Sequence, residues 1–79
     1  MKDLLSFLIN NITGASEGED FEIILVQEDG RTDLEVKAKP EIIGLIIGRE
    51  GKTIKNIRKI LSIRGVLENT SVNISVNEG

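Results

Sequence analysis

The sequence predicts an α+β domain in which three β-strands form a mixed sheet with helices on one face. Apolar residues recur at helical spacing over residues 2–12, whereas they alternate strictly with polar residues over residues 72–76. Between these segments, the strand-like residues 21–26 and 34–38 are separated by turn residues, which is typical of a hairpin. A hairpin early in the chain and a third strand at its end, with helical segments between them, indicate a small sheet covered on one face.

The first helix is expected over residues 2–12, with Asp3 as its N-cap. Its apolar residues lie three or four positions apart, so that they share one face of the helix. They are Leu4, Leu5, Leu8, Ile9 and Ile12. Residues 14–19 then predict a linker, because glycine, serine and charged residues favour irregular structure.

Two strands and a turn are expected after the linker. Residues 21–26 form the strand-like run Phe-Glu-Ile-Ile-Leu-Val, and residues 28–30, Glu-Asp-Gly, have the composition of a tight turn. In the second strand, three apolar residues alternate with two charged ones, which predicts one buried face. The apolar residues are Leu34, Val36 and Ala38, and the charged ones are Glu35 and Lys37.

The second half of the chain predicts two helices joined by a turn, followed by a strand. Pro40 suits the first position of a helix over residues 40–47, where no N–H group is needed. A longer helix is expected to start after Gly51 and to stop near Gly65. Its inward-facing residues are expected to be Ile54, Ile57, Ile60 and Leu61. The resulting order is α-β-β-α-α-β, and the crossover through two helices makes the last strand parallel to the second.

Composition limits the function of the chain. With 39% hydrophobic and 29% charged residues, residues 1–79 are expected to form a single globular domain. The absence of cysteine and histidine removes disulfides, the commonest metal ligand and the usual general base, so we predict no catalytic residue, no metal site and no cofactor. The longest apolar run, residues 42–47, is far shorter than the ~20 residues of a membrane span. We therefore expect a cytoplasmic protein without membrane contact.

Positive charge is concentrated in one short segment, although the chain has a net charge of −3. Residues 1–47 contain four basic and ten acidic side chains, whereas residues 48–64 contain six basic side chains and one acidic. Such asymmetry predicts a local surface for a polyanion. The alternative is a surface helix whose charges are only solvated.

The turn between the two later helices carries the most specific pattern. Gly48 and Gly51 lie three residues apart, and the missing Cβ atoms let the backbone of a ligand approach closely. The turn ends at a helix N-terminus, where free N–H groups and the helix dipole favour a phosphate. Arg49 and Lys52 add mobile positive charge. Together these features predict a clamp for a phosphate backbone, without a catalytic group.

This segment resembles the signature I-G-x-x-G-x-x-I of the KH family, which is matched here by Ile47, Gly48, Gly51 and Ile54. The order α-β-β-α-α-β is similar to the type II KH topology, so that the resemblance covers essentially the whole chain. The length, the N-terminal helix and the stretch of residues 44–54 look like the small stand-alone bacterial KH proteins called KhpA.

The KH resemblance implies binding of about four single-stranded RNA nucleotides in a hydrophobic groove, and a role as a post-transcriptional regulator or RNA chaperone. It implies that the turn contacts the RNA backbone, that Ile46 and Ile54 line the groove floor, and that residues 65–70 form a variable loop. The expected RNA-binding residues are Gly48, Arg49, Glu50, Gly51, Lys52, Ile46, Ile54, Lys55 and Arg58. Glu50 departs from the family pattern, in which the middle pair of the turn is usually basic, and its carboxylate opposes a phosphate.

Other interpretations remain open. The sequence Gly51-Lys52-Thr53 copies the end of a nucleotide-binding P-loop, but that pattern requires glycine at position 46 and a preceding strand. A non-enzymatic interaction module with weak RNA contact is the stronger alternative. The likeness to KhpA implies a homodimer or a heterodimer with a larger Jag-type KH protein, for which exposed isoleucines are suited. Gly48 and Gly51 could also form an ordinary helix–helix turn, and Gly44 is expected to permit close packing.

Overall fold

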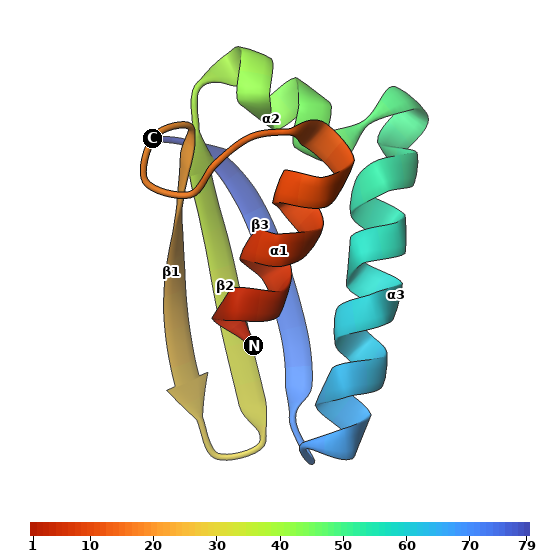
Figure 1. The fold of residues 1–79 in the computed structure, drawn as a ribbon. Coiled ribbons are helices and arrows are strands. Elements are labelled where there is room, and N and C mark those ends of the chain that lie inside the picture. The colour runs from red at the N-terminus through yellow and green to blue at the C-terminus, as the bar shows by residue number, and fades with distance from the viewer.

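The computed structural model describes residues 1–79 and confirms the predicted order of elements. These are α1 (Lys2–Thr13), β1 (Phe21–Glu28), β2 (Arg31–Ala38), α2 (Pro40–Ile47), the 3₁₀ turn η1 (Arg49–Gly51), α3 (Lys52–Leu67) and β3 (Ser71–Glu78). The helices cover one face of a three-stranded sheet, as the sequence predicted, and the other face is open (Figure 1). None of the helices combines the length and the apolar character that crossing a membrane requires.

The sheet has the strand order β1-β2-β3 and is mixed. β1 and β2 pair antiparallel along their whole lengths, so that Asp29 and Gly30 alone form the hairpin loop. Gly30 has a φ of 73°, the left-handed conformation that such a short loop requires. β2 and β3 pair in parallel, which confirms the predicted direction of the last strand. The N–H of Ser71 donates to the carbonyl oxygen of Gly30 at 2.9 Å and ties the hairpin to the start of β3.

The core lies between the helices and the inner face of the sheet. Residues 32, 34, 36 and 38 of β2 are all buried, because β2 is the central strand and lies beneath the helices. The buried apolar residues are Leu5, Ile9, Ala15, Phe21, Ile23, Leu34, Val36, Ala38, Ile46, Ile54, Ile57, Leu61 and Ile74. They come from every named helix and strand, so no element folds independently of the others.

Two expectations about the helices are wrong. Asp3 is not the N-cap of α1, because Met1 occupies that position and Asp3 lies in the first turn. Its carboxylate still suits the positive end of the helix dipole there. Ile60 is not a core residue but is 42% exposed. It lies about 100° around the helix from the buried Leu61, beyond the surface that the sheet covers.

Gly65 does not end α3, which continues to Leu67. A Cβ atom at Gly65 would lie 2.6 Å from the carbonyl oxygen of Thr70 and 2.7 Å from Cγ2 of Val72. The N–H of Thr70 donates to the carbonyl oxygen of Gly65 at 2.9 Å, and the Thr70 hydroxyl hydrogen-bonds with the buried hydroxyl of Thr32 at 2.8 Å. Glycine is therefore required because the returning chain packs directly against the helix, and not as a stop signal.

Candidate nucleic-acid interface

The turn of residues 48–51 joins α2 to α3 at one end of the molecule (Figure 1). Lys39 is extended, with φ −70° and ψ 156°, and Pro40 occupies the first turn of α2, as expected of a proline-initiated helix. The N–H of Gly48 donates to the carbonyl oxygen of Gly44 at 2.9 Å and ends α2. Because a helix precedes the turn, the strand–loop–helix arrangement of a P-loop is absent.

Two independent constraints require glycine at position 48. Its backbone has φ 75° and ψ 176°, a conformation that is open essentially only to glycine. A Cβ atom at this position would also lie 2.6 Å from Cβ of Thr53 and closer still to its hydroxyl oxygen. The side chain of Thr53, in the first turn of α3, thus fills the space that a side chain at position 48 would need. This packing gives the turn one defined shape.

The last two residues of the turn, Glu50 and Gly51, have left-handed backbone conformations. Glu50 has φ 56° and ψ 24°, and Gly51 has φ 75° and ψ 15°. A Cβ atom at Gly51 would meet nothing within 4 Å, so that only the backbone conformation requires glycine there. Glu50 adopts a conformation that is unfavourable by about 1–2 kcal/mol for a residue with a Cβ atom. The turn is thus strained at an exposed residue, and such strain is common at functional sites.

The basic side chains around the turn are exposed and lack acidic partners. The exposed ones are Arg49, Lys52, Lys55, Arg58 and Lys59. The structure has four ion pairs, and none of them involves these residues. The other two arginines both form ion pairs, Arg31 with Asp33 and Arg64 with Glu68. The uncompensated charge therefore gathers at the N-terminal half of α3.

Arg58 marks the side of this surface that faces the sheet. Its Nη2 donates to the carbonyl oxygen of Ile74 in β3 at 3.5 Å, the longest side-chain hydrogen bond in the structure. A bond of this length is weak. The guanidinium group can therefore leave the carbonyl for a stronger acceptor, and it lies between α3 and the edge of β3.

The two isoleucines expected in a groove floor belong to the core instead. Ile46 has no exposed surface, and Ile54 is also buried. Both face inward because α2 and α3 each lay one side on the sheet, and the isoleucines occupy those sides. The apolar surface that remains beside the turn comes from Leu45, which is exposed, and from the partly buried Ile47.

Gly44 does not permit the close packing that was expected of it. It is exposed, and a Cβ atom there would meet nothing within 4 Å, so close packing does not explain it. Gly44 lies one helical turn before Gly48, on the same side of α2, and Leu45 and Ile47 flank this pair. The two glycines leave a strip of bare backbone that runs up to the turn. Their spacing of four residues within a helix is the sequence signal that could have identified this strip.

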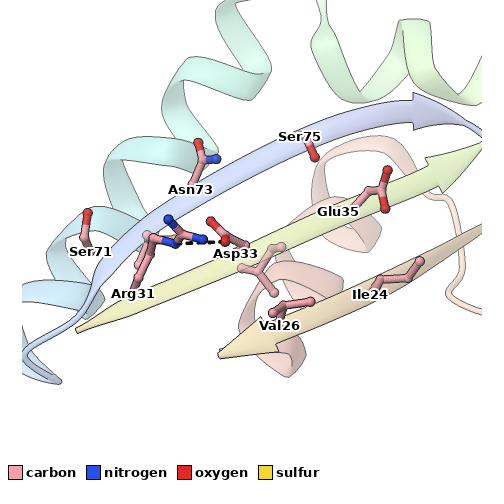
Figure 2. Close-up of a pocket in the computed structure, with 10 residues that line it drawn as sticks. Ile24, Val26, Arg31, Asp33, Glu35, Ser71, Asn73 and Ser75 are labelled. Carbon is pink, nitrogen blue, oxygen red and sulfur yellow. Dashed lines mark ion pairs between the residues drawn. The ribbon is translucent and has the colours of Figure 1, made fainter. Parts of the chain in front are cut away.

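The two largest hollows of the surface lie away from the turn. One, of about 630 Å³, lies on the open face of the sheet, and another, of about 320 Å³, lies near the linker. Figure 2 shows the first, where Arg31 pairs with Asp33 at 3.0 Å and the side chains of Ser71, Asn73 and Ser75 come from β3. Acidic side chains outnumber basic ones in both hollows, so that neither suits a polyanion.

The loop after α3 is shorter than expected and lies far from the turn. Only residues 68–70 separate α3 from β3, because residues 65–67 are helical. α3 has 16 residues, which places this loop about 24 Å from the turn along the helix axis. The expected loop of residues 65–70 is therefore limited to residues 68–70, at the opposite end of α3 from the turn.

Comparison with known proteins gives one consistent result. The sequence profile of the KhpA/KhpB KH domain matches residues 2–76. The RNA-binding protein KhpA of Chlamydia caviae is 38% identical over 79 residues, which cover 99% of this chain and 97% of that protein. The RNA-binding protein KhpA of Thermotoga maritima is 31% identical over 62 residues, which cover 78% of this chain and 80% of that protein. A probable transcription termination protein NusA of Thermoplasma acidophilum is 39% identical over 61 residues, which cover 77% of this chain but only 40% of that protein.

Proposed function

Because the chain belongs to the KhpA/KhpB family of KH domains, we propose that it binds single-stranded RNA through the turn of residues 48–51 and the basic side of α3. The observation that carries this proposal is the group of exposed, unpaired cations beside a turn with two glycines. Such cations are stabilised by the phosphates of a nucleic acid, since no acidic side chain compensates them.

The backbone of the RNA contacts the turn in this proposal. Gly48 and Gly51 carry no side chains that would keep a ligand from the backbone of the turn, and Gly44 extends this accessible backbone by one helical turn. No side chain caps the N-terminus of α3, and the N–H of Lys52 donates to the carbonyl oxygen of Arg49, so that the helix favours a phosphate through the positive end of its dipole. Arg49 and Lys52 neutralise the phosphates, whereas Glu50 repels them and limits the affinity.

The remaining contacts come from α3 and from the flank of α2. Lys55 extends the positive surface along α3, and Arg58 contacts the RNA on the side that faces β3. Leu45 and Ile47 supply apolar surface for the bases, in place of the buried Ile46 and Ile54. An unpaired strand can lay its bases against such a surface, whereas a duplex keeps its base edges within its grooves.

The experiment that tests this function compares one short unstructured RNA with its own duplex. We expect the single strand to bind more tightly, because only an unpaired strand can lay its bases against the apolar surface beside the turn. If about three phosphates are neutralised, log affinity falls against log salt with a slope near −2. An affinity that does not depend on salt, or equal binding of the duplex, would contradict the proposal.

The cellular role that fits this activity is that of a cytoplasmic post-transcriptional regulator or RNA chaperone, which acts alone, as a homodimer or with a larger Jag-type KH protein. A second candidate function is a pairing module with weak RNA contact. The exposed apolar residues of the second half of α3 favour it. RNA crosslinking in cells separates the two, because a pairing module alone would recover no RNA above background.

A further inference from the structure

β1 lies at one edge of the sheet, and its second half is covered only by β2. The consecutive apolar residues Ile24, Leu25 and Val26 are 41%, 40% and 49% exposed, respectively. Ile24 and Val26 point outward from the open face of the sheet, where Figure 2 shows them beside β2. Leu25 lies on the helix side, opposite the buried Leu34, but the helices leave this end of β1 uncovered (Figure 1). We refer to residues 22–28 as the β1 edge.

The free side of the β1 edge presents unpaired backbone groups. In an antiparallel ladder, alternate residues point their N–H and C=O groups toward the partner strand and away from it. The carbonyl oxygen of Phe21 accepts from the N–H of Gly18, in the linker, at 2.8 Å, so that Phe21 points away from β2. Ile23, Leu25 and Gln27 therefore point away as well, and no strand pairs with them on that side. The bond from Gly18 shows that this side of β1 accepts an extended segment.

The surroundings of the β1 edge are strongly acidic. Residues 17–35 contain eight acidic side chains and a single basic one, Arg31, whose charge is compensated by Glu28 and Asp33. On the open face, Asp33 and Glu35 lie directly opposite the two exposed apolar residues of β1. Like charges prevent identical edges from pairing with each other. The same charge attracts a basic strand and repels RNA.

We propose that the β1 edge binds an extended basic segment of another protein, which adds a fourth strand to the sheet. The backbone of the segment pairs with Ile23, Leu25 and Gln27, and its apolar side chains cover the exposed ones of β1. Basic side chains near its two ends lie beside Glu22 and Glu28. The β1 edge of a second copy does not fit, because two acidic edges would then lie side by side.

This binding edge is separate from the turn of residues 48–51. The hairpin that follows β1 is bonded to Ser71, so that it lies at the loop end of α3, about 24 Å from the turn along the helix axis. Figure 1 shows the hairpin and the turn at opposite ends of the molecule. The proposal therefore goes beyond the proposed RNA binding and does not depend on it.

The first test uses the synthetic peptide Lys-Thr-Val-Val-Val-Thr-Lys. Its sequence reads the same in both directions, so that a lysine lies beside Glu22 and Glu28 whichever way the strand runs. The control peptide Glu-Thr-Val-Val-Val-Thr-Glu keeps the apolar residues and reverses the charge. In an NMR titration at low salt, the lysine peptide should bind at least about tenfold more tightly. Equal affinities, or no binding of the lysine peptide, would overturn the proposal.

Amide hydrogen exchange locates the bound peptide. In the free protein, the N–H groups of Ile23, Leu25 and Gln27 should exchange fast, because they point away from β2. Saturation with the lysine peptide should slow their exchange by at least about tenfold. Slower exchange only at other residues would place the peptide on another surface. Slower exchange of these three groups at high protein concentration, without peptide, would show that two β1 edges pair. Either outcome overturns the proposal.

Two further comparisons separate the backbone from the charge. Leu25→Pro removes one outward N–H, which an edge strand tolerates, and should weaken binding of the lysine peptide about fivefold relative to Leu25→Ala. Changing Glu22 and Glu28 together to lysine should reverse the preference, so that the glutamate peptide binds more tightly. The same change at the exposed Glu41 and Glu78, outside β1, should leave the preference as it is in the parent.

Circular dichroism checks that each variant folds. If the proline variant is unfolded, the charge exchange decides alone, because both glutamates are exposed. A preference that persists after the exchange in β1, or that reverses equally in the control variant, overturns the proposed site.

Discussion

Two short turns of this protein contain a left-handed glycine, but their surroundings differ. In the hairpin turn, a Cβ atom at Gly30 would meet nothing within 4 Å, and the adjacent Arg31 is paired with Asp33 at 3.0 Å and with Glu28 at 4.0 Å. In the turn of residues 48–51, Gly48 packs against Thr53, and the neighbouring cations have no acidic partner.

The difference shows which feature indicates a site. A positive φ marks only a sharp bend, because both turns have it. The hairpin turn needs its glycine for the conformation alone, and its one cation, Arg31, is compensated by two carboxylates. The other turn is packed into one shape and leaves its positive charge unsatisfied, which is the condition under which a phosphate gains most by binding.

The largest expected effect is on stability. Gly48→Ala forces a Cβ atom into Thr53 and into a backbone conformation that alanine avoids, and it should lower the free energy of unfolding by about 3 kcal/mol. Gly30→Ala meets only the conformational penalty and should lower it by about 1 kcal/mol. Chemical denaturation followed by circular dichroism measures both values. Equal losses would mean that the packing against Thr53 contributes nothing.

The next effect is on RNA affinity at the turn. Changing Arg49 and Glu50 together to aspartate places two carboxylates where phosphates are expected, and it should weaken RNA binding by about 2 kcal/mol, or roughly 30-fold. Both side chains are exposed, so the fold should survive. Arg31→Asp makes the same change of charge at the hairpin turn and should leave affinity within about twofold. A similar loss in both proteins would show that only net charge matters.

Glu50→Lys should act in the opposite direction. It removes a repulsive charge and adds an attractive one beside the expected phosphates, so binding should improve by about 1 kcal/mol at low salt and by less at high salt. Glu28→Lys makes the same exchange beside the hairpin turn and provides the control. Titration of a short unstructured RNA at two salt concentrations measures both variants. An equal gain in the two would refute a contact at residue 50.

The smallest effect concerns the strain at residue 50. Glu50→Gly relieves the left-handed penalty but increases the flexibility of the unfolded chain, so the net gain in the free energy of unfolding should be about 0.5 kcal/mol. Glu22→Gly, at an extended position in β1, should instead destabilise the protein by about 0.5–1 kcal/mol. The same denaturation experiment measures both. A loss of stability in Glu50→Gly would mean that the turn is not strained.

Much of the fold could be predicted because local sequence patterns indicate individual helices, strands and turns. Alternation over residues 72–76 identified β3, Pro40 identified the start of α2, and the acidic turn residues before Gly30 identified the hairpin. The candidate turn could be predicted for the same reason, since its glycines and cations are close together in the sequence. The contribution of Gly44 and Leu45 to the surface beside the turn could not be predicted, because it depends on which side of α2 faces the sheet.

The sequence by itself determined which elements form and in what order, because hydrophobic period, proline and glycine act within a few residues. Only the tertiary structure decided which apolar side chains are buried. Ile46 and Ile54 have the same character as Ile60 and Ile63, but the first two face the sheet and the others face outward. Period places residues on a common side of a helix, whereas burial depends on what covers that side. Gly65 illustrates this dependence, because glycine is required there only by the close approach of Thr70 and Val72.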